Sequence, residues 1–399
     1  MDESTIELRE SLGLESDPEY VAKLSADKTA DTKRLGIPLT TGESKEMEAR
    51  SDLAEKSDDV EKLVDPTGTY GGTYIDNLAG GDLVVNTTAP LPEVVNDSLT
   101  SLVGAARLVV KEVPYTYDYL VDVSNQIATS PLWQQGYATK ANLNTETNAI
   151  EVSFLDTAPA NAEDLWRATF GPSLTFSRDG EVAQVAAGRD QTSGPLYGGQ
   201  WLNGAGGNCT TGYSNVRDSV GRYYTLSAGH CFPNGTIVRQ GKFDSNGRGV
   251  GYASSNSVRY GGSTNCDCVP IGEIPGGTGT EQTRVNYNNL FRYTNANRQA
   301  VRGEVVCHSG ASTFEAQGEI SCGGVTAATG QQLVGGPDGR SFTLTDRVEV
   351  AFRVELGDSG GPVGMGSTFL GMVSYRLGPA LGGYSKAQNV GTVNVRLGF

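Results

Sequence analysis

The chain has 399 residues and a formal net charge of −15 at pH 7, a length that exceeds one ordinary hydrophobic core and predicts two domains. Residues 1–190 hold 33 Asp and Glu against 15 Lys and Arg, whereas residues 191–399 hold 13 against 16 and all six Cys and both His. The acidic first half argues against a nucleic acid partner, and no run of 18 apolar residues is present that could cross a membrane.

The first half is predicted to be a small α+β domain. Its first 35 residues are polar and short of aromatic residues, so we expect them to be loosely ordered. Residues 39–64 predict a helix, because Thr40 and Glu43 have the spacing of a capping box and a narrow apolar stripe follows. The later predicted elements are a hairpin over 70–88, a helix leading into a strand over 96–110, a helix over 116–133, a hairpin over 137–154 and a helix over 160–171.

Residues 188–199 are rich in linker residue types, and we place the boundary there, with domains 1–190 and 191–399. From about residue 195 onward, short β-type runs alternate with turns of Gly, Asn and Ser. Regularly spaced short strands with almost no helical period predict an all-β barrel or sandwich.

Two motifs in the second half suggest catalysis. The stretch LGDSGGPVG at 356–364 surrounds Ser359 with glycines, which cost backbone entropy and need a reason. The glycines are explained if Ser359 is a nucleophile, because its neighbours must then bring backbone N–H groups close to a reacting carbonyl. Such a serine needs a general base, and His230 in TLSAGHCF at 225–232 is one of only two histidines. An isolated His is more often structural, but its pairing with the serine motif favours catalysis.

The two motifs AGHC and GDSGGP together resemble the signature of the chymotrypsin-fold serine peptidases, and most closely the bacterial branch with N-terminal prosegments that includes alpha-lytic protease and the streptogrisins. The resemblance covers about residues 195–399 and implies two six-stranded β-barrels with the active site between them. Ser359 is then the nucleophile and His230 the base, and the backbone N–H groups of Gly357 and Ser359 form the oxyanion hole.

The order His, Asp, Ser implied by the resemblance places the third member between residues 231 and 358. Asp267, in NCDCVPIGEI at 265–274, begins an alternating run as the family Asp does. Asp244, in the turn-like FDSNGRG, is the rival. We expect Asp267 to complete the triad.

The cysteines fit the same resemblance, which implies a Cys209–Cys231 and a Cys307–Cys322 disulfide. Two such bridges indicate an oxidising compartment. Cys266 and Cys268 are left over, and on an extended strand they are too far apart for a relaxed bond without a kink. Free buried thiols, a strained vicinal bridge and exchange with a partner all stay open. No other ligands lie nearby in the sequence, so we expect no metal and no cofactor.

The sequence also departs from the family. No Cys follows residue 322, so the usual Cys pair around the specificity pocket is absent. His308 stands where the family often has an Arg paired with the buried Asp beside the nucleophile. We hypothesise that a protonated His308 neutralises Asp358. The alternative is an exposed His with no role.

The resemblance places the substrate pocket at the residues just before the nucleophile and at SYRLG, 374–378, with Leu356, Ser374, Tyr375 and Arg376 as its expected lining. Arg353 stands where trypsin-like enzymes have an Asp, which argues against trypsin-like cleavage. Arg353 or Arg376 could favour acidic side chains, or both are surface arginines.

The first half resembles the prosegments of the same family, which assist folding and inhibit the protease until they are cleaved; here cleavage is expected near 189–193. The chain is thus predicted to be a monomeric, secreted serine endopeptidase made as a zymogen, whose partners are protein or peptide substrates and its own prosegment. The start MDESTIELRE lacks the features of a secretory signal, so we expect that signal to lie outside this chain. The competing hypothesis is a catalytically inactive binding module.

Overall fold

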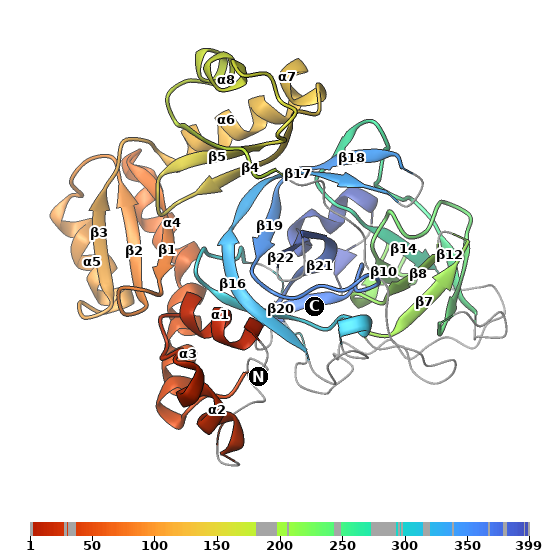
Figure 1. The fold of residues 1–399 in the computed structure, drawn as a ribbon, viewed down its shortest axis with the longest axis horizontal. Coiled ribbons are helices and arrows are strands. Elements are labelled where there is room, and N and C mark those ends of the chain that lie inside the picture. The colour runs from red at the N-terminus through yellow and green to blue at the C-terminus, as the bar shows by residue number, and fades with distance from the viewer. Residues whose placement is uncertain are drawn as a thin grey trace. The chain divides into compact units, whose positions relative to one another are not determined.

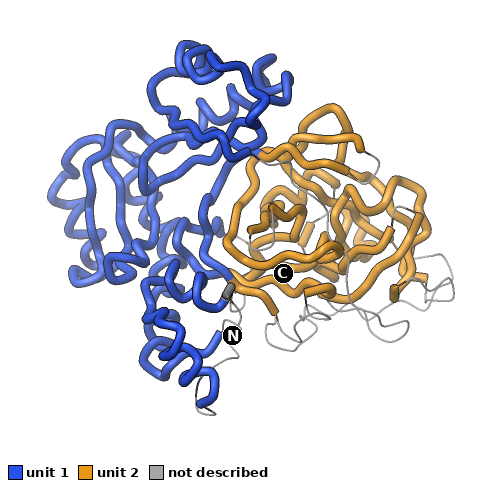
Figure 2. The backbone as a smooth tube through the Cα atoms, viewed as in Figure 1, with its two compact units in different colours: residues 1–181, 298–305, 323–331 blue, residues 182–297, 306–322, 332–399 orange. Residues whose placement is uncertain are grey.

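The computed structural model of the protein describes residues 3–27, 30, 37–180, 198–205, 207–242, 249–272, 293, 296, 298–313, 320–336, 339–365, 368–377, 381–394 and 396–397. Figure 2 shows two compact units, of which unit 1 comprises Met1–Glu181, Arg298–Val305 and Gly323–Gln331 and unit 2 the rest. Unit 1 therefore includes two short segments from the second half of the chain. The predicted cleavage region at 189–193 lies outside the described residues, as does Asp244.

The expectation of loose order over residues 1–35 is wrong where the structure has two helices, α1 (Glu3–Ser11) and α2 (Pro18–Ala26). The reason is a buried cation that composition does not reveal. The Arg9 side chain is buried, donates to the carbonyl of Pro38 at 2.7 Å and pairs with Glu43 at 2.5 Å. This ion pair attaches α1 to the helix that contains Glu43, α3 (Thr41–Glu55).

The predicted helix over 39–64 consists of two helices, α3 (Thr41–Glu55) and α4 (Ser57–Val64), followed by the 3-10 turn η1 (Asp65–Thr67). The capping box is confirmed, because Thr40 Oγ1 accepts from the Glu43 N–H and Glu43 Oε2 accepts from the Thr40 N–H at 2.8 Å. Both helices pack against a three-stranded sheet of β1 (Tyr70–Asp76), β2 (Asp82–Thr87) and β3 (Leu108–Glu112). The helix α5 (Glu93–Val103) connects β2 to β3 in the sequence.

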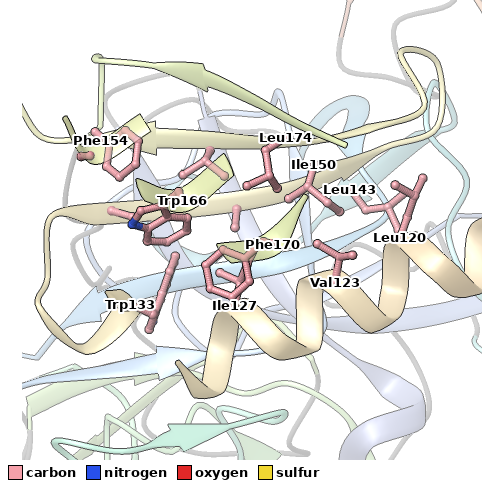
Figure 3. Close-up of a cluster of buried hydrophobic side chains, with 14 of the residues drawn as sticks. Leu120, Val123, Ile127, Trp133, Leu143, Ile150, Phe154, Trp166, Phe170 and Leu174 are labelled. Atoms are coloured by element: carbon pink, nitrogen blue, oxygen red, sulfur yellow. The ribbon is translucent and has the colours of Figure 1, made fainter. Parts of the chain in front are cut away.

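A second group of elements in unit 1 has its own core (Figure 3). The elements are α6 (Tyr117–Thr129), α7 (Pro131–Gln134), β4 (Ala138–Asn144), β5 (Ala149–Phe154), α8 (Ala162–Phe170) and β6 (Leu174–Ser177). Leu120, Val123 and Ile127 recur at helical spacing on one face of α6 and pack with Trp166 and Phe154. The predicted hairpins and helices of the first half are thereby confirmed, with an α+β arrangement.

Two segments of the second half are bound within unit 1. Residues 329–331 begin β17 (Thr329–Gly335), which neighbours β4 in its sheet. Gly330 approaches so closely that an added Cβ would lie 2.8 Å from the Ala141 carbonyl oxygen. In the other segment, the Arg302 carbonyl accepts from the Ile75 N–H at 2.8 Å.

Unit 2 is all-β, as predicted, and Figure 1 labels many of its strands. One sheet has eight strands in the order β23-β9-β10-β14-β12-β11-β7-β8, and a second group closes as the six-stranded barrel β15-β16-β19-β22-β21-β20. The fold class, a two-barrel domain preceded by an α+β region, is confirmed. The bounds in the eight-stranded sheet are β7 Trp201–Gly204, β8 Gly207–Thr210, β9 Ser214–Arg217, β10 Tyr223–Ser227, β11 Ile237–Gln240, β12 Gly249–Ala253, β14 Val269–Gly272 and β23 Arg396–Leu397.

The closed barrel consists of β15 (Val305–His308), β16 (Ser321–Ala327), β19 (Arg347–Val350), β20 (Pro362–Met365), β21 (Thr368–Leu377) and β22 (Leu381–Lys386). The short strand β13 (Ser263–Thr264) pairs in parallel with β18 (Ser341–Leu344), and the 3-10 helix η2 spans Ala387–Val393. Across the ranges that the structure describes, no helix has both the length and the apolar character needed to cross a membrane.

Candidate active site

The register of two neighbouring strands brings His230 and Asp267 together. Strands β10 and β14 are antiparallel, and Ser227 pairs with Val269 at the end of the ladder. His230 follows Ser227 by three residues and Asp267 precedes Val269 by two, so both lie beyond the same end of this strand pair. The Ser359 loop comes from the closed barrel, immediately before β20.

These three side chains form one continuous hydrogen-bonded array. His230 Nε2 lies 3.0 Å from Ser359 Oγ, and His230 Nδ1 lies 2.6 Å from Asp267 Oδ2. The second carboxylate oxygen, Asp267 Oδ1, accepts from the His230 backbone N–H at 2.9 Å. All three residues are buried. The arrangement gives a hydroxyl a proton acceptor on one side of an imidazole and a carboxylate on the other, as nucleophilic catalysis requires.

The Asp267 main chain is fixed by a pair of buried serines. The Asp267 N–H donates to Ser385 Oγ at 2.9 Å, and Ser385 Oγ in turn lies 2.8 Å from Ser374 Oγ. Ser374, expected in the substrate pocket, therefore has its side chain in this buried network. Tyr375 is also fully buried, and that burial raises the pKa of its hydroxyl.

The nucleophile loop needs glycine at two positions with left-handed backbone, Gly357 (φ 111°) and Gly360 (φ 89°). A Cβ at Gly360 would also lie 2.3 Å from the Thr210 carbonyl oxygen and 2.4 Å from Ser227 Oγ. Thr210 at the end of β8 fixes the loop, because its N–H donates to the Ser359 carbonyl at 2.8 Å and its hydroxyl donates to the Gly357 carbonyl at 2.5 Å. Glycine is therefore required here by the left-handed backbone at both positions and by the close packing at Gly360.

The expected pairing of His308 with Asp358 is wrong. Asp358 accepts instead from the backbone N–H groups of Ser312, Thr313 and Glu355 at 2.8–3.1 Å and from the Thr313 hydroxyl. His308 is buried rather than exposed, and its Nε2 lies 2.6 Å from the Arg353 carbonyl oxygen. Several N–H dipoles stabilise the carboxylate here without a formal cation.

All six cysteines are bonded. The two disulfides that the resemblance implied, Cys209–Cys231 and Cys307–Cys322, are present. Cys266 and Cys268 form the third, so among the alternatives left open the vicinal bridge is the one observed. Cys209, His230 and Cys231 cluster closely enough to suggest metal ligands. Two of them are already joined as a disulfide, which leaves no thiolate pair to bind an ion.

At the predicted substrate pocket, Leu356 is exposed and Arg376 is half-buried. The Arg353 guanidinium contacts Glu355 at 2.6 Å, and Arg376 lies 3.7 Å from the other oxygen of the same carboxylate. Two arginines thus share one Glu, and this cluster keeps a net positive charge.

Sequence reasoning missed two residues that join the His230 and Asp267 loops. Asn256 Nδ2 donates to the carbonyls of Gly229 and Phe232 on either side of His230. Ser257 Oγ accepts from the Cys268 N–H at 3.0 Å. Asn and Ser are common in turns, so no signal in the sequence distinguishes these two from other turn residues.

The fold and the site together resemble those of the serine peptidases of the chymotrypsin fold. No family model matches the chain. Over 180 residues, 45% of this chain and 93% of the relative, the chain is 28% identical to Serine protease 2 of Streptomyces fradiae. The solved structure of a Nocardiopsis protease is 25% identical, with 51% of this chain and 99% of that chain covered and a TM-score of 0.40. Thermobifida fusca protease A is 24% identical, with 51% and 98% covered and a TM-score of 0.39. The similarity to Serine protease 2 confirms the predicted resemblance to serine peptidases.

Proposed function

We propose that the chain is a serine endopeptidase that cleaves peptide bonds through an acyl-enzyme on Ser359, with His230 as general base and Asp267 as its orienting carboxylate. The observation that carries this proposal is the array in which His230 Nε2 lies 3.0 Å from Ser359 Oγ while Nδ1 lies 2.6 Å from Asp267.

The proposed reaction has two acyl-transfer steps. Ser359 Oγ attacks the amide carbonyl carbon while its proton passes to His230 Nε2, and the N–H groups of Gly357 and Ser359 bind the oxyanion. His230 then donates this proton to the leaving amine as the C–N bond breaks. A water molecule, deprotonated by the same imidazole, then attacks the acyl ester. His230 returns that proton to Ser359 Oγ as the ester C–O bond breaks and the acid product leaves. Asp267 stays ionised and keeps the Nδ1 proton in place. Each oxyanion donor contributes about 2.7–4 kcal/mol to such a transition state.

The substrate side chain would contact Leu356 and Arg376 in this proposal, together with the main chain at 374–376. The side chains of Ser374 and Tyr375 support this strand from the interior, since both are buried. The positive charge shared by Arg353 and Arg376 beside Glu355 disfavours basic substrate side chains.

The proposal includes synthesis as a zymogen, with residues 1–190 as a prosegment that assists folding, and secretion to an oxidising compartment. The contacts of two second-half segments within unit 1 support the prosegment role. Arg302 pairs with Glu146 at 2.9 Å, and the Gly303 carbonyl accepts from Asn77 Nδ2 at 2.8 Å. Non-local β pairing folds slowly, and binding these segments lowers that barrier. The Cys209–Cys231 and Cys307–Cys322 disulfides support secretion.

A fluorophosphonate probe tests the chemistry. In the processed protein obtained by expressing the full chain, we expect covalent labelling, located at Ser359 by peptide mass spectrometry, and loss of labelling in His230→Ala. Cleavage of a peptide library by the wild-type chain, but not by Ser359→Ala, would establish peptide hydrolysis. A wild-type protein that neither labels nor cleaves is instead the binding module considered above.

The prosegment role has its own test. Gly303 has φ 82°, and an added Cβ would lie 2.1 Å from the Ile75 carbonyl oxygen, whereas Gly261 has φ 76° and open space around it. We expect Gly303→Ala to reduce the yield of active protease severalfold more than Gly261→Ala does. Equal yields would contradict the role of this contact in folding.

A further inference from the structure

Cys266 and Cys268 flank Asp267 in the sequence, and the disulfide between them constrains the backbone at Asp267. The two Cα atoms are 5.3 Å apart, whereas two residues of extended strand span about 6.6–7.2 Å. The chain is therefore bent at Asp267 by a small covalent ring. Both cysteines are fully buried and pack with Leu226 and Tyr213.

We propose that this disulfide is a positioning group for Asp267, and that closing the ring holds the Asp267 backbone in the bend that aims both carboxylate oxygens at His230. The proposal rests on the proposed function above, in which Asp267 orients the imidazole.

The carboxylate needs such a constraint because its two oxygens have different partners. Oδ1 accepts from the His230 backbone N–H at 2.9 Å, while Oδ2 lies 2.6 Å from Nδ1. A small rotation of the Asp267 backbone would lengthen at least one of these contacts. Productive geometry in such sites is held within fractions of an ångström by groups that are themselves fixed.

The strand ladder does not supply this constraint. Strand β13 ends at Thr264 and β14 begins at Val269, so Asp267 lies between the two. The main chain here is bonded mostly by side-chain hydroxyls. The Cys266 carbonyl accepts from Thr264 Oγ1 at 2.8 Å, and Ser257 Oγ donates to the Cys268 carbonyl at 2.9 Å. The ring adds a covalent restraint to these hydrogen bonds.

Stability alone gives a weaker reason for the bridge. In the chain-entropy model a disulfide stabilises more as the closed loop lengthens. The Cys266–Cys268 bridge has a sequence separation of 2, against 22 for Cys209–Cys231 and 15 for Cys307–Cys322. The shortest bridge constrains the unfolded chain least, yet it is the one whose ring contains Asp267.

The test compares two disulfide deletions in the full chain, Cys266→Ser/Cys268→Ser and the matched control Cys307→Ser/Cys322→Ser. Active sites are counted with the fluorophosphonate probe, and kcat and KM are measured per titrated site. We expect the first deletion to lower kcat about 10²-fold, the cost of a misplacement near 1 Å, with KM unchanged. We expect the control to keep the wild-type kcat while its unfolding temperature falls further, because its closed loop is longer. If the serine pair yields little folded protein, Cys266→Ala/Cys268→Ala makes the same comparison without placing hydroxyls in the apolar site.

A readout independent of turnover keeps this proposal separate from the proposed function. The chain has only two histidines, so the low-field ¹H NMR signal of an Nδ1 proton bonded to a carboxylate can be assigned with His230→Ala. In a Ser359→Ala background we expect the signal to be present with the ring closed and to be lost or shifted with it open. An unchanged signal, or an unchanged kcat per active site, would overturn the proposal, whereas an inactive wild type whose signal still depends on the ring would overturn only the proposed function.

Discussion

Replacing Asp267 with Asn provides the sharpest test of the hydrogen-bond geometry at this site. Asn has the shape of Asp, but an NH₂ group replaces one of the two carboxylate oxygens. The His230 backbone N–H donates to Oδ1 at 2.9 Å, so the Asn oxygen must occupy that position to accept the same bond. The Asn NH₂ then occupies the Oδ2 position, 2.6 Å from His230 Nδ1.

An NH₂ group at that position requires Nδ1 to be the acceptor, which moves the imidazole proton to Nε2. A protonated Nε2 cannot accept the Ser359 proton, although the two atoms are 3.0 Å apart. We therefore expect Asp267→Asn to lower kcat about 10⁴-fold, which corresponds to about 5.5 kcal/mol of transition-state stabilisation. The stability of the fold should change little, because the side-chain volume is kept.

The assay is the hydrolysis of a peptide ester or anilide, with active sites titrated by a slow covalent label. Asp244→Asn is the matched control, because Asp244 is the other candidate that the sequence offers for the triad. We expect Asp244→Asn to keep wild-type kcat. An Asp267→Asn protein within tenfold of the wild type would refute the tautomer argument, and a large loss in Asp244→Asn would transfer the role to that residue.

Three further outcomes follow from the structure. Gly360→Ala should abolish most activity and destabilise the fold in urea titrations, because its Cβ would lie 2.3 Å from a backbone oxygen. The control Gly235→Ala, at φ 85° in open space, should lower the unfolding free energy by only about 1–2 kcal/mol. Phe154→Ala, in the core of Figure 3, should lower the unfolding free energy of unit 1 by about 3–5 kcal/mol, measured by calorimetry on the inactivated full chain. Burial raises the pKa of Glu43, but hydrogen bonds from Arg9 and Thr40 outweigh it and lower this pKa below its ordinary 4.5. The stability that Glu43 contributes is therefore present above pH 4.5 and lost as the pH falls through the lowered value. Glu43→Gln should flatten the acid limb of the unfolding free energy, and an unchanged limb would contradict the pairing with Arg9.

Local patterns predicted the first half of the fold well, because each signal involves residues close in sequence. The capping box at Thr40 and Glu43 and the hairpin over 137–154 are of this kind. The helices α1 and α2 were not predicted, because the packing of this segment involves Arg9, whose partner Glu43 is 34 residues away. Composition alone treats a buried, paired arginine as a solvated charge.

The candidate site was predictable to a different extent for each residue. His230 and Ser359 stand in specific motifs, so their identity is readable from the sequence. The choice of Asp267 depended on a positional analogy. Its physical basis is the pairing of Ser227 with Val269, which places the loops after β10 and before β14 at one end of the sheet. A strand register of this kind joins residues about 40 positions apart and has no local signature.

Asp358 shows why a correct motif gives the residues of a site but not their hydrogen-bond partners. A buried carboxylate can be stabilised by a formal cation or by several N–H groups that point at it. The first solution requires an Arg, Lys or His, which the sequence displays. The second, observed here from Ser312, Thr313 and Glu355, uses backbone donors that every residue except proline possesses. His308 was assigned to Asp358 because the resemblance places at that position an Arg that pairs with this carboxylate. Because the main chain already supplies these donors, replacing His308 would remove no hydrogen bond from Asp358.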